Sequence, residues 1–73
     1  MQIGHEIHKE LKRQERTVTW LARKLNCHRQ NVYDIFQRQT IDTQLLLRIS
    51  AILHRDFFQL YSAELQTKMS KET

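Results

Sequence analysis

Hydrogen-bonding side chains that would share one side of a helix occur at four positions near the middle of the chain: Arg29, Gln30, Tyr33 and Asp34. An arginine guanidinium pairs bidentately with guanine, a glutamine amide pairs with adenine, and a carboxylate accepts a hydrogen bond from cytosine. Asp34 repels phosphate, so we interpret it as a cytosine reader or as the orienting partner of a nearby arginine. These residue types predict base contacts from one helix face, with a phosphate as the alternative partner of Tyr33.

Five further side chains are candidates for contact with a phosphate backbone: Arg16, Thr17, Lys24, Asn31 and Arg38. Asn31 has the alternative of bonding the backbone of a neighbouring turn. The candidate base readers also have simpler interpretations, namely a solvated arginine at position 29, a surface aromatic at 33 and an ordinary helix charge at 34.

The net charge of the chain lies in its centre. The formal net charge is +4 over 73 residues, and the positive and negative charges balance in residues 1–15 and again in residues 39–73. Residues 16–38 carry arginine and lysine against a single acid, Asp34. A basic patch of this kind attracts a polyanion, and nucleic acid is a common one. A merely solvated basic face is the other interpretation.

Helices are the expected elements, because the sequence has no proline and one glycine, too few turn residues for a β-sandwich or barrel. Apolar periodicity predicts five helices, with Thr17, Asp42 and Asp56 as N-caps and a tight turn at 26–28. The expected ranges are 2–14, 18–25, 28–37, 43–53 and a fifth helix from about 57 that frays near 67. We therefore predict an all-α, compact five-helix domain over 1–66, followed by a polar, disordered tail over 67–73.

Residues 21–36, which read LARKLNCHRQNVYDIF, resemble the XRE family of Cro and lambda-repressor-like helix-turn-helix domains. Leu21-Ala22, Cys27, Val32 and Ile35 match the pattern of that family. The likeness extends over residues 3–65, through Ile3-Gly4 with Ile7, Leu46-Leu47-Arg48-Ile49 with Leu53, and Phe57 with Leu60. It implies a lambda-repressor-like fold whose second and third helices form the helix-turn-helix.

The sequence departs from the family pattern at four places. Asn26 replaces the turn glycine, His28 replaces the serine or threonine cap of the recognition helix, and Val18 replaces a polar residue. The glycine that often follows the recognition helix is missing from residues 37–40. The fold tolerates these changes, but base specificity cannot be transferred by analogy.

The resemblance implies a sequence-specific transcriptional regulator that sets helix 28–37 into the major groove of double-stranded DNA as a homodimer. Apolar residues beyond a minimal core suggest the dimer interface: Leu45, Ile52, Phe58, Tyr61 and Leu65. The alternative is a protein-interaction module, for example an antitoxin-like protein, that uses the fifth helix. A module of that kind need not confine its charge to the predicted recognition unit.

Other classes of function find little support in the sequence. No paired carboxylates, glycine-rich phosphate loop or nucleophile with a base is visible, so we predict no enzyme, cofactor or small-molecule ligand. His5 and His8 lack a third metal ligand nearby, and we predict no metal site. The single cysteine, Cys27, is expected to be a buried apolar residue. No membrane span or signal peptide is apparent, which predicts a cytoplasmic, nucleoid-associated protein.

Overall fold

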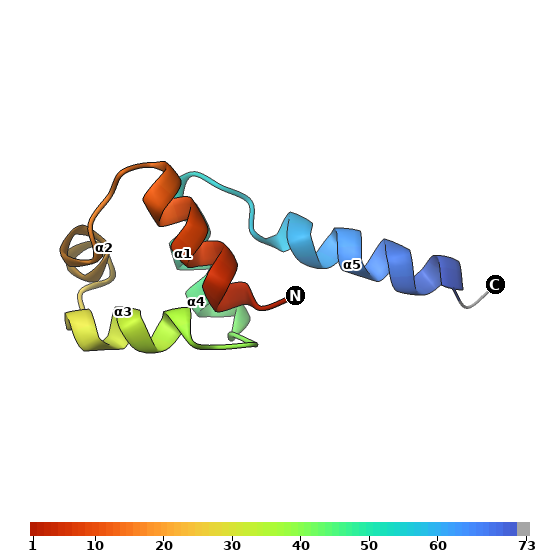
Figure 1. Cartoon of the computed structure of the whole chain (residues 1–73), viewed down its shortest axis with the longest axis horizontal. Coiled ribbons are helices and arrows are strands. Elements are labelled where there is room, and N and C mark those ends of the chain that lie inside the picture. Colours follow the sequence, from red (N-terminus) through yellow and green to blue (C-terminus); the bar gives the residue numbers. More distant parts are fainter. Residues whose placement is uncertain (72–73) are drawn as a thin grey trace.

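The computed structural model describes residues 1–71 and contains five α-helices and no strand in that range. The prediction of an all-helical chain with five helices is confirmed. The helices, seen in Figure 1, are α1 Ile3–Arg13, α2 Val18–Leu25, α3 Arg29–Phe36, α4 Thr43–Leu53 and α5 Phe58–Lys71.

Local capping explains several of the helix ends. The Thr17 hydroxyl accepts a hydrogen bond from the backbone N–H of Trp20 at 3.0 Å, and Asp42 Oδ1 accepts one from Leu45 N–H at 2.8 Å. Asp56 Oδ1 accepts from Phe58 N–H at 3.0 Å, before α5. Asn26 ends α2 in the left-handed conformation, with a φ of 57°. The predicted caps at 17 and 42 are therefore confirmed, and Asp56 bonds the first residue of α5 from two positions before it.

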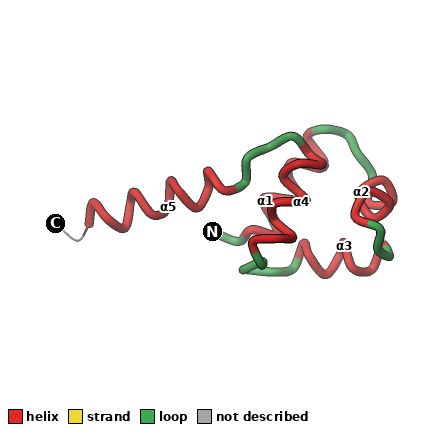
Figure 2. Tube along the Cα trace, turned by 180° about the vertical axis from the view of Figure 1, so that it is seen from behind, coloured by secondary structure: helices red, strands yellow, loops and turns green. Residues whose placement is uncertain are grey.

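The first four helices surround one apolar core, and Figure 2 shows them grouped at one end of the molecule. Each of α1–α4 contributes three buried apolar side chains, and Phe57 joins them from the segment before α5. Those of α3 are Val32, Ile35 and Phe36. Because this apolar face of α3 is held by the core, the opposite face of the helix must point outward.

Helix α1 crosses the end of α3 at very short range. The Gly4 N–H donates to the Arg38 carbonyl at 3.0 Å. A Cβ at Gly4 would lie 2.3 Å from the Ile35 carbonyl oxygen and 2.5 Å from that of Phe36. Glycine is required here because only a residue without a side chain lets the two backbones approach this closely.

A buried carboxylate joins α1 to the segment after α4. Glu10 is 2% exposed, and it accepts hydrogen bonds from Arg13 Nε at 3.0 Å, Gln14 Nε2 at 2.6 Å and an Arg55 guanidinium nitrogen at 2.9 Å. The hydrogen bond from Arg13, helped by those from Gln14 and Arg55, lowers the pKa of Glu10 to about 2, although burial alone would raise it. Gln14 also donates to the Leu53 carbonyl at 2.7 Å.

Helix α5 leaves the body formed by α1–α4 and extends away from it (Figure 1). The molecule consequently measures 45 × 20 × 19 Å, and none of the 14 residues of α5 is buried. The helix continues to Lys71, so the prediction of a disordered tail over 67–73 is wrong for residues 67–71. The last two residues of that predicted tail lie outside the described part of the chain.

Candidate nucleic-acid interface

Helices α2 and α3 are joined by a tight turn that orients α3 against the core. The N–H of Cys27 donates to the Ala22 carbonyl at 2.9 Å, and the left-handed Asn26 redirects the chain. The His28 side chain makes no capping bond at the start of α3. The orientation of α3 therefore depends on its apolar face and on α1 rather than on a side-chain cap.

The four candidate base readers all lie on the exposed face of α3: Arg29, Gln30, Tyr33 and Asp34. Behind them, the Phe36 ring stacks on the His8 imidazole of α1, with centroids 4.1 Å apart and planes at 9°. Burial, followed by the positive charge of Lys12, lowers the pKa of His8. This stacking is a second contact between α1 and α3, in addition to the close approach at Gly4, and it helps to fix the position of α3.

Two of these four side chains are bonded to one another. Gln30 Nε2 donates to Asp34 Oδ1 at 3.2 Å, across one turn of α3. The partner of Asp34 is therefore Gln30 rather than the arginine considered from the sequence. Tyr33 is 49% exposed and meets the Phe36 ring edge-on at 6.2 Å, so half of its ring remains accessible. Arg29 projects from the start of the helix with no ion pair among the contacts described.

Three of the candidate backbone contacts lie at or along α2. The Arg16 guanidinium lies over the Trp20 ring at 4.5 Å from its centroid, and the Lys24 ammonium lies at 5.9 Å. The Trp20 indole thus makes cation–π contacts with two positively charged side chains. Thr17 uses its oxygen as the N-cap of α2, but its hydroxyl hydrogen can still be donated outward.

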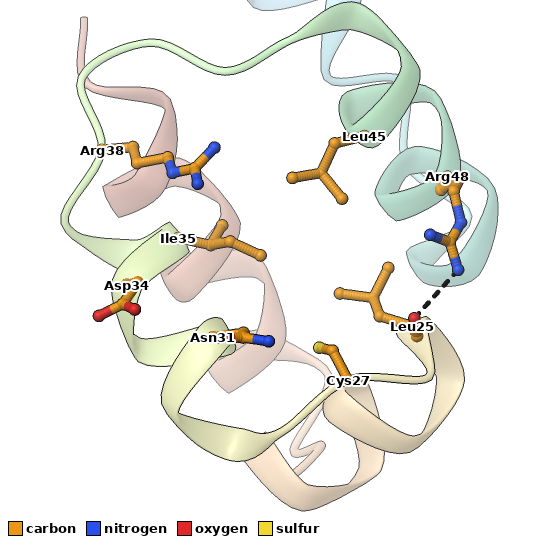
Figure 3. A pocket seen from close by; sticks show the side chains of 8 residues that line it. All are labelled: Leu25, Cys27, Asn31, Asp34, Ile35, Arg38, Leu45 and Arg48. Atoms are coloured by element: carbon orange, nitrogen blue, oxygen red, sulfur yellow. Dashed lines mark hydrogen bonds between the residues drawn. The ribbon is translucent and has the colours of Figure 1, made fainter.

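The other two candidates, Asn31 and Arg38, line a groove of about 240 Å³ between α3 and α4. Figure 3 shows both side chains reaching toward this groove, whereas the carboxylate of Asp34 points away from it. Arg48 of α4 borders the same groove and donates to the Leu25 carbonyl at 3.1 Å. Sequence reasoning missed Arg48 because its contact with α2 joins residues 23 positions apart.

The five residues proposed for a dimer interface do not line one surface. Leu45 borders the groove of Figure 3, and Ile52 lines a hollow beside Trp20. Phe58 and Tyr61 are half-buried on α5, and Leu65 is 55% exposed.

Leu47, which the sequence analysis did not select, is also 55% exposed and lines a hollow with Phe58. The core positions Leu46 and Ile49 imply this exposure, since at about 100° per residue Leu47 lies on the side of the helix nearly opposite Ile49. Leu47 therefore belongs with the α5 residues rather than with Leu45 or Ile52.

Within residues 1–71, no group of three or more His, Cys, Asp or Glu side chains is arranged to hold a metal ion. No helix in that range has the length and apolar character to cross a membrane. The thiol of Cys27 is free and half-buried at the edge of the core, where it borders the groove of Figure 3.

Comparison of the chain with family models, with curated proteins and with solved structures gave no significant match.

Proposed function

We propose that the chain is an XRE-type helix-turn-helix domain, with α2 and α3 as the motif, and that it regulates transcription by binding a specific sequence in double-stranded DNA. On this proposal α3 enters the major groove, which is about 12 Å wide and admits one helix. Such a protein would act in the cytoplasm, on the nucleoid.

The observation that carries the proposal is the division of α3 into two faces. Val32, Ile35 and Phe36 are at most 4% exposed, whereas the four candidate base readers on the other side are exposed. A helix anchored in this way presents its polar groups at fixed positions, which readout of base edges requires.

Charge supports the same interface. The basic segment 16–38 supplies cations near the motif, namely Arg16 and Lys24 around Trp20 and Arg38 at the end of α3. These groups would contact phosphates and set the register of the protein on the duplex, while α3 would read the bases.

Selection of bound sequences from random duplex DNA tests the proposal. We expect one enriched motif, and an inverted repeat of it if the protein binds as a dimer. Arg29→Ala combined with Gln30→Ala should lose this selectivity and keep the helical circular-dichroism spectrum. Retained selectivity in the double variant would exclude the outer face of α3 as the reading surface.

The salt dependence of binding gives an independent test. The three cations assigned to phosphates, Arg16, Lys24 and Arg38, predict a slope of about −3 for each bound copy when the logarithm of the binding constant is plotted against that of the salt concentration. A flat response would argue against a phosphate-bound interface.

A second candidate function is a protein-interaction module, and α5 favours it. Phe58, Tyr61, Leu65 and Met69 follow one another at steps of three and four residues, so they share one face of a helix that buries no residue. On the first proposal this stripe pairs with a second copy. On the alternative it binds another protein. Sedimentation of the free chain distinguishes the two, because only the first predicts a homodimer.

A further inference from the structure

We infer that Gln30 and Asp34 act as one reading unit that selects an adenine and a neighbouring cytosine in the major groove, and that Asp34 excludes guanine from the position read by Gln30. This inference rests on the proposed function and goes beyond it, because it names part of the DNA sequence that the protein recognises. The observation behind it is the hydrogen bond from Gln30 Nε2 to Asp34 Oδ1 at 3.2 Å, on the exposed face of α3.

The hydrogen bond fixes which way the Gln30 amide faces. An ionised carboxylate only accepts hydrogen bonds, so the nitrogen of the amide, and not its oxygen, must be directed at Asp34. One N–H is then used within the protein. The amide has one N–H and its carbonyl oxygen left to present to a base.

That remaining pair of groups matches adenine and conflicts with guanine. Adenine offers an acceptor at N7 and a donor at N6, which pair with one N–H and one carbonyl oxygen. Guanine offers acceptors at both N7 and O6. A free glutamine can turn its NH₂ group toward them, whereas Gln30 held by Asp34 would bring its carbonyl oxygen against O6.

Asp34 retains a second carboxylate oxygen for DNA. In Figure 3 its side chain points away from the groove between α3 and α4. Oδ1 accepts from Gln30, which leaves Oδ2 free to accept from the N4 amino group of cytosine. The acceptors of guanine and thymine at the same depth in the groove would instead be repelled.

The contact between the two side chains also limits the distance between the bases. Positions 30 and 34 are about 6 Å apart along the helix axis, and their end groups converge to 3.2 Å. Successive bases of a strand are about 3.4 Å apart along the duplex. The adenine and the cytosine therefore belong to adjacent base pairs.

The test begins with the motif that the wild-type protein selects from random duplex DNA. Binding is then measured to duplexes that carry each of the four base pairs at the adenine and cytosine positions. We expect the wild type to prefer adenine over guanine by about tenfold, as for a bidentate contact. Asp34→Ala should reduce that preference to about twofold and abolish the cytosine preference. Asp34→Asn should relax both in the same way, because an amide can bond either end of the Gln30 amide.

Gln37→Ala is the matched control, since Gln37 is exposed at the end of α3 and only its backbone N–H bonds Asp34, at the main-chain carbonyl, a bond that the substitution leaves in place. It should leave both preferences unchanged. The variants alter exposed positions, and circular dichroism verifies that they fold. The double variant Gln30→Ala/Asp34→Ala should lose less binding free energy than the two single variants lose in sum. Each single change already breaks the hydrogen bond that makes the two side chains one unit.

The outcomes separate the inference from the proposed function. A wild-type protein that selects no motif contradicts the proposed function itself. A selected motif without adjacent adenine and cytosine overturns only the inference. The inference is also overturned if the Asp34→Ala variant keeps the preference for adenine over guanine, or if the binding losses of the two single variants add up to that of the double variant.

Discussion

Helices α3 and α5 differ in the way they relate to the core, although both expose much of their surface. The eight residues of α3 bury three apolar side chains, and α1 supports its end through Gly4 and His8. The 14 residues of α5 bury none, and the helix extends beyond the body (Figure 1). The shorter helix is therefore the better fixed of the two.

This difference is consistent with the different tasks that we propose for the two helices. Polar groups on α3 are held at defined positions, which suits recognition of a rigid pattern of base edges. In the apolar stripe of α5, Phe58 and Tyr61 pack against the core, whereas Leu65 and Met69 are more than half exposed, which suits docking of another helix. Charge divides them further, since α5 lies outside the basic segment 16–38.

Truncation of one apolar residue in each helix should give the largest contrast. Ile35→Ala removes a side chain that is 4% exposed and should lower the free energy of unfolding by about 3 kcal/mol. Leu65→Ala removes one that is 55% exposed and should change it by less than about 0.5 kcal/mol in the monomer. Urea unfolding at low protein concentration measures both. Equal losses would contradict the contrast between the helices.

Gly4→Ala tests the support of α3 by α1. A methyl group at this position meets the carbonyls of Ile35 and Phe36, so we expect a loss of about 2 kcal/mol from forced separation of the helices. Alanine has the higher intrinsic helix propensity, and a gain in stability would therefore show that the close approach is unimportant. Gln2→Ala, at an exposed position before the same helix, is the control.

The pH dependence of stability should follow Glu10. Its pKa of about 2 lies below the ordinary value of 4.5, so its contribution is complete above pH 4.5 and is lost as the pH falls toward 2. With allowance for the exposed partner Arg13, that contribution is about 2 kcal/mol. Glu10→Gln should be less stable than wild type at pH 6, and the two should converge near pH 2. A difference independent of pH would exclude this role.

A charged residue in the apolar stripe of α5 should weaken self-association without changing the stability of the monomer. Leu65→Asp should weaken self-association at least about tenfold, because a carboxylate would have to be desolvated at the interface. The unfolding midpoint of the dilute protein should not move. Sedimentation velocity over a concentration series measures the effect, with Gln66→Asp as the control on an adjacent face. Unchanged association in Leu65→Asp would remove α5 from the interface.

Features that depend on neighbouring residues could be predicted from the sequence. The apolar periodicity placed the fourth helix at 43–53, where α4 lies, and the caps at Thr17 and Asp42 were recognised from residue type alone. The expected exposure of the four polar residues of α3 followed from the same periodicity. Local rules sufficed because capping and amphipathicity act within one or two turns.

Contacts between distant segments could not be predicted in this way. The approach of Gly4 to α3, the bond from Arg55 to Glu10 and the bond from Arg48 to Leu25 all depend on tertiary packing. The length of α5 was underestimated because residues 67–71 have a polar composition. Ala63, Glu64, Leu65, Gln66 and Lys68 are good helix formers, and their propensity was the overlooked signal.

Backbone amide chemical shifts, followed by NMR during titration with the duplex selected from random DNA, test the central claim most directly. We predict the largest chemical-shift changes at residues 29–34 and at Arg38. Residues in the outer half of α5 should change only if the protein forms a dimer. Changes concentrated in α5 with none in α3, or no saturable change with any duplex, would contradict the account.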